Sequence, residues 1–239
     1  MRRTRLMLGT VIVAVLLSQN LFAMSALQKI LIDATIDKWE KVDTFQGILV
    51  ESGVLPDGRD LKSLVMIERP ALFYSETLAP EKLAGDFFLS DGKTIYAYYK
   101  RYHYGIYIAG LLDLISDSKE RRARRLADNM TAATKKFRVS LEENQKVADA
   151  TCVSYYFSPK SSKDNPDDHL TSYRTWSELD YFLPLKAEFY NKQNTSVYEF
   201  TYRFFMVNKP LDKDRVQTGF PPGTSTSVWD FNDPALTWP

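Results

Sequence analysis

The chain is poor in the residues that build metal centres, disulfide frameworks and catalytic triads. Among its 239 residues it has one cysteine, Cys152, and two histidines, His103 and His169. Multi-histidine zinc sites and disulfide scaffolds need more of both residue types. Neither histidine has the sequence neighbours of a triad or a metal site. We therefore expect a protein that is not an enzyme and that has no metal site and no cofactor.

The chain also lacks an excess of charge of one sign. It has 31 basic and 30 acidic residues, a formal net charge of +1. Nucleic-acid binding is dominated by a broad basic surface, so we expect no nucleic-acid partner. The sequence contains no nucleophile elbow, phosphate loop, His-Glu-x-x-His or dinucleotide fingerprint either.

Aromatic residues, in contrast, are plentiful, with 14 Tyr, 14 Phe and 4 Trp. They favour β-strands, and they suit a surface that holds an apolar ligand. The length fits one globular domain with a small appendage.

The first segment is typical of a secretory signal. Arg2, Arg3 and Arg5 precede an apolar run from Leu6 to Leu17, and small residues follow near Ala23 to Ala26. This run is short for a membrane span. We predict a signal peptide over 1–26 and export to the periplasm, with an uncleaved anchor as the alternative. Cleavage would leave 28 basic and 30 acidic residues.

The mature chain begins with a helical pattern and continues with strands. Apolar residues recur at helical spacing from Leu27 to Val42, and short β-branched and aromatic runs follow. Asp-Gly pairs at 57–58 and 91–92 indicate hairpins. The predicted strands are Phe45–Ser52, Leu61–Glu68, Leu72–Leu78, Phe137–Leu141, Cys152–Phe157, Tyr173–Trp176, Leu185–Tyr190 and Tyr198–Val207. Cys152, inside one of them, is expected to be a small buried side chain.

The last predicted strand has an apolar face. Alternation along a strand puts every second residue on the same side. The residues expected to share that side are Tyr198, Phe200, Tyr202, Phe204 and Met206. Such a face either packs on a helix in the ordinary way or holds a ligand, and the pattern leaves both interpretations open.

A helical insertion is predicted over 109–136, between the two groups of strands. It carries four arginines within five residues, Arg121, Arg122, Arg124 and Arg125. Such a run is usually the solvated face of a helix. The alternative is docking to anionic lipid headgroups or to an acidic partner.

Several short motifs resemble the periplasmic outer-membrane lipoprotein carrier LolA and its lipoprotein-sorting superfamily. They run in order along residues 27–223, and 224–239 form a tail without a match. The motifs are Asp43-Thr44-Phe45-Gln46-Gly47, Ile67-Glu68-Arg69-Pro70-Ala71-Leu72-Phe73, Ala79-Pro80-Glu81, Leu89-Ser90-Asp91-Gly92-Lys93-Thr94-Ile95-Tyr96, Leu183-Pro184-Leu185-Lys186-Ala187-Glu188-Phe189-Tyr190 and Phe220-Pro221-Pro222-Gly223.

The resemblance implies a mainly β (α+β) fold, a strongly curved antiparallel half-barrel with helices capping the concave face. The arginine before the proline, here Arg69, would tie the lid helices to the barrel, with a plain surface arginine as the alternative. The resemblance places Phe73 at the cavity side. Together with the apolar face of the last strand, the expected lining of an acyl-chain cavity is Leu72, Phe73, Tyr198, Phe200, Tyr202, Phe204 and Met206.

These features predict a periplasmic carrier that shelters the acyl chains of a lipoprotein or lipid. Its expected partners are the acylated cargo, an inner-membrane donor and an outer-membrane acceptor, and the chain is expected to be a monomer. The same broad fold also serves an envelope-stress regulator that binds an anti-sigma factor. A sensing module that binds a partner protein is therefore the alternative.

Overall fold

The structure, a computed structural model, describes residues 35–92, 94–109, 136–161 and 171–230. The predicted signal segment 1–26 lies outside the described residues, and so do the arginines at 121, 122, 124 and 125. In the part of the chain that is described, no helix has the length and hydrophobicity needed to cross a membrane.

The described chain is built mainly from strands. Residues 35–40 are helical, and short 3₁₀ turns cover η1 (Glu81–Leu83), η2 (Lys100–Tyr102) and η4 (Lys213–Arg215). The strands are β1 (Thr44–Ser52), β2 (Leu61–Glu68), β3 (Leu72–Ala79), β4 (Phe87–Asp91), β5 (Ile95–Tyr99), β6 (Tyr104–Ala109), β7 (Phe137–Leu141), β8 (Gln145–Val147), β9 (Ala150–Pro159), β10 (Ser172–Glu178), β11 (Pro184–Tyr190), β12 (Ser196–Val207) and β13 (Ser225–Asp230).

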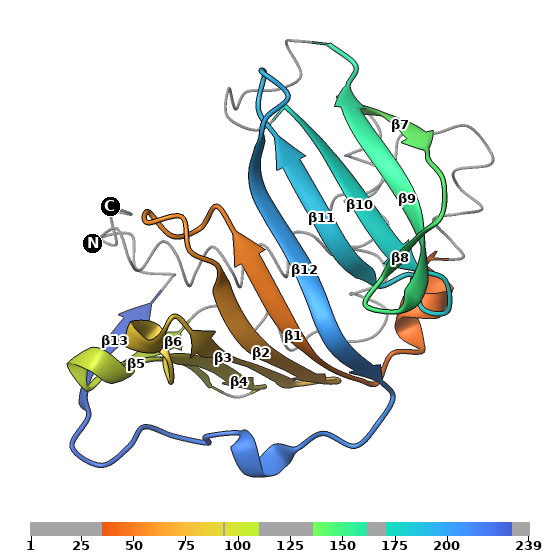
Figure 1. The fold of residues 1–239 in the computed structure, drawn as a ribbon. Helices are drawn as coiled ribbons and strands as arrows, with labels where there is room; N and C mark the ends of the chain where they lie inside the picture. Colours follow the sequence, from red (N-terminus) through yellow and green to blue (C-terminus); the bar gives the residue numbers. More distant parts are fainter. Residues whose placement is uncertain (1–34, 93, 110–135, 162–170, 231–239) are drawn as a thin grey trace.

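All thirteen strands belong to one open sheet. Its order is β13-β6-β5-β4-β3-β2-β1-β12-β11-β10-β9-β7, with β8 paired to β9. We call β1 to β6 with β13 the first half, and β7 to β12 the second half. The halves meet where β1 pairs with β12. Figure 1 shows the sheet bending there, so that the second half stands up from the first.

The mainly β, antiparallel architecture expected from the sequence is confirmed. Each predicted strand is present, with ends that differ by a few residues at most. The hairpin predicted at Asp91-Gly92 joins β4 to β5. Gly92 has a φ of 80° there, which only glycine adopts without strain. The expected capping helices fall mostly on residues that are not described, so only helical residues 35–40 can be placed.

The segment after β12 lies against one face of the first half. Residues 208–224, which we call the strap, pass beneath this half in Figure 1 and lead to β13. Their side chains Leu211, Val216 and Phe220 pack against the sheet. We call this side of the whole sheet the outer face and the opposite side the concave face.

The strand β13 was not predicted, because its residues were set apart as a tail. It pairs with β6 in parallel, whereas all other pairings among the described strands are antiparallel. The phenol of Tyr104 donates to Ser227 Oγ at 2.6 Å, and Trp229 packs on the concave face. The end of the described chain is thus an edge strand of the same sheet.

A β-bulge interrupts β12 where the two halves meet. Gln46 pairs with Met206 and Ile48 with Arg203, so β12 has one residue more than β1 in this interval. The extra residue is Phe204, which has a φ of 52°. After an inserted residue, alternation resumes on the opposite faces.

Candidate functional site

A row of stacked aromatic rings crosses the concave face of the second half. Phe157 on β9 stacks on Tyr173 on β10, with ring centres 4.3 Å apart. Tyr173 contacts Phe189 on β11 at 5.6 Å, and Phe189 contacts Tyr198 on β12 at 5.4 Å. Neighbouring strands bring these side chains together because the residues are cross-strand partners on the same face. We call these four residues the aromatic row.

Three residues of the aromatic row were not singled out from the sequence. Phe157, Tyr173 and Phe189 each lie in a correctly predicted strand. Alternation along each strand predicts which of its residues share a face. Which faces meet, however, depends on the strand order and register, and these follow only from the tertiary structure.

The concave face of β12 agrees with the sequence only up to the bulge. Tyr198, Phe200 and Tyr202 pack in one apolar cluster with Phe45 and Leu49 of β1. The ring of Phe45 meets that of Tyr202 edge-on, with centres 5.0 Å apart. These three β12 residues therefore lie on one face, as expected.

The prediction that Phe204 and Met206 share this face is wrong. Phe204 is 86% exposed, and Met206 is 44% exposed and pairs with Gln46. The bulge at Phe204 shifts the alternation by one residue, so that Phe205 and Val207 pack in the concave cluster instead. The sequence gives no local sign of the bulge, because Phe204 is neither glycine nor asparagine.

The prediction that Leu72 and Phe73 line the same surface is also wrong. The two are adjacent in β3, and adjacent residues of a strand point to opposite faces. Phe73 lies on the concave face, where its ring meets that of Phe88 at 5.8 Å. Leu72 packs on the outer face, in the cluster beneath the strap.

The concave face of the first half is apolar as well. It consists of buried residues of β4, β5 and β6, against which Phe73 and Trp229 pack. The buried members are Phe88, Ile95, Ala97, Ile106 and Ile108. Both halves thus present apolar concave surfaces, joined through β1 and β2.

Arg69 holds the end of the helical residues 35–40 to the sheet. Its guanidinium donates to the carbonyl oxygen of Trp39 at 2.6 Å and lies 5.2 Å from the centre of the Trp39 ring. Its backbone N–H donates to Asp43 O at 2.8 Å. A helix end leaves carbonyls without partners in the helix, and a guanidinium satisfies them well. Arg69 is therefore bound to a carbonyl at the end of the opening helix.

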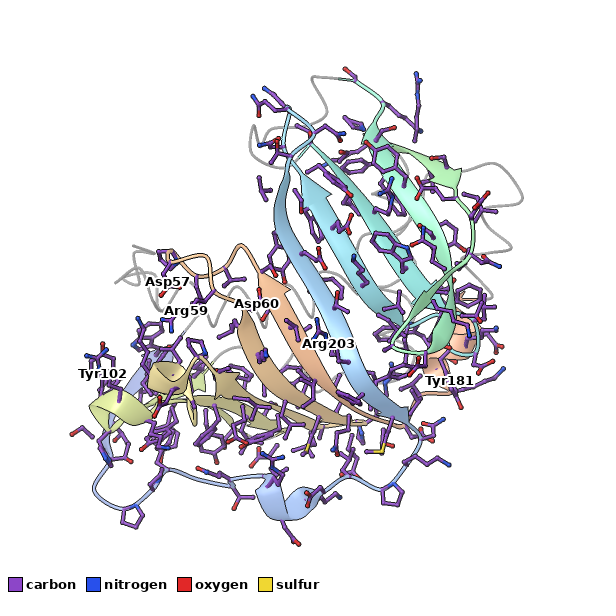
Figure 2. All side chains as sticks on the ribbon, viewed as in Figure 1. Asp57, Arg59, Asp60, Tyr102, Tyr181 and Arg203 are labelled. Atoms are coloured by element: carbon purple, nitrogen blue, oxygen red, sulfur yellow. The ribbon has the colours of Figure 1, made fainter. Side chains whose placement is uncertain are left out.

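Asn208, at the start of the strap, holds the same junction from the other side. Its side chain accepts from the backbone N–H of Asp43 at 2.8 Å and donates to Lys41 O at 2.7 Å. It also donates to the phenol of Tyr181 at 3.5 Å. Figure 2 labels Tyr181 beside this junction. Arg69 and Asn208 together fix where the chain leaves the helix and enters β1.

One carboxylate is buried in the apolar concave face. Glu51 on β1 is 1% exposed, and Tyr198 donates to its Oε1 at 2.7 Å. Burial, with Glu51 nearby, raises the pKa of the Tyr198 and Tyr202 phenols. Both phenols therefore stay protonated at neutral pH, and that of Tyr198 donates its hydrogen bond to Glu51.

Cys152 is the small buried side chain that the sequence predicts. It is fully buried and free, and burial raises the pKa of its thiol to about 11. A thiol that stays protonated at neutral pH is a poor nucleophile. Among the described residues, no three His, Cys, Asp or Glu side chains are grouped so that they could hold a metal ion.

Comparison with known proteins gives likeness in structure alone. No family model matches, and no curated protein matches in sequence. An uncharacterized conserved protein from Thermus thermophilus has a similar structure, at 11% identity over 82% of this chain and 98% of that one, with a TM-score of 0.54.

MucB of Pseudomonas aeruginosa, solved in complex with MucA, matches at 17% identity over 79% of this chain, with a TM-score of 0.52. This chain covers 61% of the length of the MucB chain. A LolA superfamily protein from Nitrosomonas europaea also matches, at 13% identity over 78% of this chain and 97% of that one, with a TM-score of 0.33. The described residues have a fold similar to that of the Thermus thermophilus protein and of MucB. At identities this low, the likeness shows the fold alone.

Proposed function

We propose that this protein is a periplasmic carrier or binding protein, not an enzyme, that shelters acyl chains of a lipoprotein or lipid on its concave face. The observation that carries the proposal is the apolar concave surface of both halves, with the aromatic row crossing the second half. An extended apolar surface on the inside of a bent sheet suits a flexible hydrocarbon chain.

Energetics support a carrier with a shallow binding surface. Each CH₂ group exposed to water costs about 0.8 kcal/mol, so a chain of about 16 carbons costs on the order of 12 kcal/mol. The burial of several such chains would exceed the practical ceiling of non-covalent affinity, about −18 to −21 kcal/mol, so a carrier that buried them fully would release them too slowly. A binding face whose cover is held by only a few polar bonds allows the cargo both to bind and to leave.

Arg69 is the residue that we propose tethers the cover to the sheet. Its bond to Trp39 O is charge-assisted and short, and the contact with the Trp39 ring adds to it. Helical residues 35–40 pack on the concave face through Ile36 and Trp39. Displacement of this helix by cargo would break few polar contacts, which suits a reversible closure. The helical insertion 109–136 is proposed as a further part of the cover.

The test is uptake of acylated molecules by the purified mature protein. Native mass spectrometry would detect lipid that co-purifies, and palmitate or a palmitoylated peptide would serve as added probes. We expect bound acyl chains in the purified protein or uptake of these probes. A protein that arrives empty and takes up none of them would contradict the proposal.

The bulge in β12 provides a matched pair of variants for this test. Phe200 is 3% exposed on the concave face and Phe204 is 86% exposed, four residues further along the same strand. Phe200→Ala should weaken uptake severalfold, and Phe204→Ala should leave it unchanged. Equal effects of both changes would mean that the cargo does not bind the concave face.

A second candidate is a sensing module that binds a partner protein. It is favoured by the likeness to MucB, which was solved in complex with MucA. Docking to such a partner, to an inner-membrane donor or to an outer-membrane acceptor would use Arg121, Arg122, Arg124 and Arg125. Neutralising the four arginines separates the candidates. Lost partner capture with normal acyl uptake would assign these arginines to docking.

Export is also part of the proposal, because residues 1–26 have the three parts of a signal peptide. Mass spectrometry of the protein from a cell-envelope extract would give its first residue. We expect cleavage after Ala23 or Ala26. A chain that still begins at Met1 would favour an anchor instead.

A further inference from the structure

The strand β13 forms one of the two edges of the sheet. It lies at one end of the strand order, beside β6, and β7 lies at the other end. Figure 1 shows β13 at the border of the first half. Among the described strands, none pairs with the far side of β13. Proteins usually block such an edge with charges, prolines, bulges or very short strands, because its backbone N–H and C=O groups can pair with another chain.

The edge at β7 is blocked in this way. The strand is only five residues long, and it includes the exposed Arg138. The exposed Lys136 precedes it. It also shares its neighbour β9 with the three-residue strand β8. A second chain would therefore meet charges and an interrupted edge there.

The edge at β13 has no such protection within its own residues. Ser225–Asp230 contains no proline, and its only charged residue is the last one. All six residues pair with Tyr104–Ala109 without a shift of register, so there is no bulge. Thr226 and Val228 are exposed, Val228 by 69%. In the described part of the chain, this edge is open to pairing with a further strand.

The hydrogen bonds of β13 show which of its backbone groups face outward. The N–H of Ser225 donates to His103 O at 2.9 Å, on the side of β6. Backbone groups alternate in direction along a strand, so those of Ser227 and Trp229 also face β6. Those of Thr226 and Val228 face away from it. Each of these two residues thus offers one donor and one acceptor to an added strand.

The same strand borders the surface that we propose for acyl chains. Trp229 packs on the concave face, against the cluster that includes Ile106 and Ile108 of β6. A strand added to β13 would lie about 4.8 Å from it and would extend this face. An acylated polypeptide joins hydrocarbon to peptide at one residue. With its acyl chain on the concave face, the peptide must leave across a border, and at β13 it would meet backbone donors and acceptors.

We infer that β13 binds the polypeptide of an acylated cargo by strand addition. The backbone groups of Thr226 and Val228 would pair with an extended segment next to the acylated residue. The inference rests on the function proposed above and narrows its substrate class to acylated polypeptides. Recognition through the backbone depends little on the side chains of the cargo, so extended segments of different sequence would bind unless they are rich in proline.

The experiment compares two lipopeptides that differ only in their backbone donors. Both are N-palmitoylated hexapeptides of serine and threonine, and the second is N-methylated at every peptide nitrogen so that it cannot donate. Isothermal titration calorimetry gives both dissociation constants for the mature protein. The unmethylated lipopeptide should bind about tenfold more tightly, which corresponds to about 1.4 kcal/mol. The same hexapeptide without the palmitoyl group should bind at least about tenfold more weakly than the lipopeptide.

Proline at an outward-facing position of β13 should remove this preference. Val228→Pro deletes an N–H that faces away from β6 and leaves the ladder between the two strands in place. The ratio of the two dissociation constants should therefore fall toward one. Thr226→Pro tests the same row of groups independently, and Val228→Thr, which keeps the N–H, should retain the preference. If a proline variant does not fold, the comparison of the two lipopeptides on the wild-type protein still decides the question.

The matched control is Leu141→Pro at the other edge of the sheet. Leu141 is 69% exposed, like Val228. The N–H of Glu142 donates to Ser154 O at 2.9 Å, so the backbone groups of the preceding Leu141 face away from β9. The same kind of substitution at this edge should leave the preference intact.

Amide exchange measured by NMR reports on the edge directly. In the free protein the amides of Thr226 and Val228 should exchange faster than those of Ser227 and Trp229, which face β6. The unmethylated lipopeptide should slow the exchange of the two outward amides about tenfold or more. Slow exchange of these amides in the free protein would mean that another part of the chain or a second copy covers the edge, and would overturn the inference.

The binding results separate this inference from the proposed function. Equal binding of the two lipopeptides by the wild-type protein would overturn strand addition and leave the carrier function standing. A preference that survives both proline variants, or that folded Leu141→Pro also loses, would do the same. Binding of the unacylated hexapeptide as tightly as the lipopeptide would overturn the acylated cargo as the occupant. Binding of palmitate but of neither lipopeptide would overturn the inference alone, and binding of none of these probes would overturn both proposals.

Discussion

The outer faces of the two halves of the sheet differ in the side chains they carry. The outer face of the first half is apolar, with Leu64, Met66, Tyr74, Phe87, Leu89 and Tyr98 buried beneath the strap. In the second half the same side carries charged and aromatic residues that bind one another. Only the concave faces are apolar in both. The sheet is therefore not apolar on both sides throughout. The concave face is the one surface that is apolar in both halves.

The strap is held by one aromatic side chain above all. The ring of Phe220 lies 4.9 Å from that of Tyr107, 5.7 Å from that of Tyr96 and 6.1 Å from that of Tyr98. It rests on Gly105, where a Cβ atom would come within 2.7 Å of the ring. Ion pairs of Lys213 with Glu68 and of Arg215 with Glu76 lie at its exposed border.

On the outer face of the second half, charged and aromatic side chains bind one another. Arg174 binds Glu142 through two nitrogens, at 2.7 and 3.0 Å, and lies over the rings of Tyr156 and Trp176. Lys186 binds Glu188 at 2.7 Å. We call these residues, with Tyr190 and Glu199, the outer network. Arg203, labelled in Figure 2, projects from β12 between the two halves.

The largest effect is expected from Phe220→Ala. Loss of the ring removes the contacts that hold the strap to the first half, at a cost of about 3 kcal/mol in the free energy of unfolding. Urea denaturation measures it. Phe204→Ala, at an exposed ring, is the control and should change stability by less than about 0.5 kcal/mol. A similar small loss for Phe220→Ala would mean that the strap is not needed by the first half.

Gly105→Ala should destabilise the same contact from the sheet side. The added Cβ would push the Phe220 ring away, at a cost of about 2 kcal/mol. Because both changes act on one contact, the combined variant with Phe220→Ala should be less destabilised than the sum of the single variants. Additive losses would show that Gly105 matters for another reason.

Arg174→Met should weaken the second half by a smaller amount. Methionine keeps most of the side-chain length and removes the ion pair with Glu142 and the stacking on the Tyr156 ring. A partly exposed network residue of this kind contributes about 1–2 kcal/mol. High salt should narrow the difference in the free energy of unfolding between Arg174→Met and the wild-type protein. It should leave the difference between Phe220→Ala and the wild-type protein unchanged. If both variants depended on salt in the same way, the outer faces of the two halves would not differ in how they are stabilised.

Phe204→Gly should stabilise the boundary between the halves. Phe204 has a φ of 52° and an exposed ring, so glycine relieves backbone strain with little loss of packing. The expected gain in the free energy of unfolding is about 0.5–1 kcal/mol. Thermal denaturation would reveal it, with Phe204→Ala as the reference. A loss would mean that the exposed ring has a packing role at the bend.

The smallest predicted effect is a loss of stability of the second half at low pH. Burial alone would raise the pKa of Glu188, but hydrogen bonds from Lys186 and Tyr190 outweigh it, and the pKa lies below its ordinary value of 4.5. A lowered pKa stabilises the fold above the unfolded value, and this stability is lost as the pH falls through the folded value. Glu188→Gln should therefore narrow the difference in stability between pH 7 and pH 4 by less than about 1 kcal/mol. If Glu188→Gln left the difference in stability between pH 7 and pH 4 unchanged, Glu188 would not contribute to the loss of stability in acid.

The strands could be predicted because their signals are local. The periodicity of Leu61–Glu68 and Phe137–Leu141 gave the observed ends of β2 and β7. The turn at Gly92 also depends on neighbouring residues alone. Arg69 could be predicted to bind a helix carbonyl only through resemblance, since Trp39 is thirty residues away.

The errors arise where a face depends on distant residues. Leu72 and Phe73 were grouped by family likeness, and the pleat of β3 separates them. The bulge at Phe204 shows only in the pairing of β12 with β1, where the register shifts between Gln46 and Ile48. β13 looked like a tail because a parallel edge strand needs β6 beside it, and nothing in its six residues reveals that pairing.

By itself, the sequence determined that this is a mainly β protein, rich in aromatic residues and with only one cysteine and two histidines. Those properties follow from composition and from periodicity over a few residues. Only the tertiary structure decided which aromatic residues form the row, and that it ends at the Glu51 carboxylate. Strand order and register bring together residues that are far apart in the chain, and a single inserted residue reverses which side each later side chain faces.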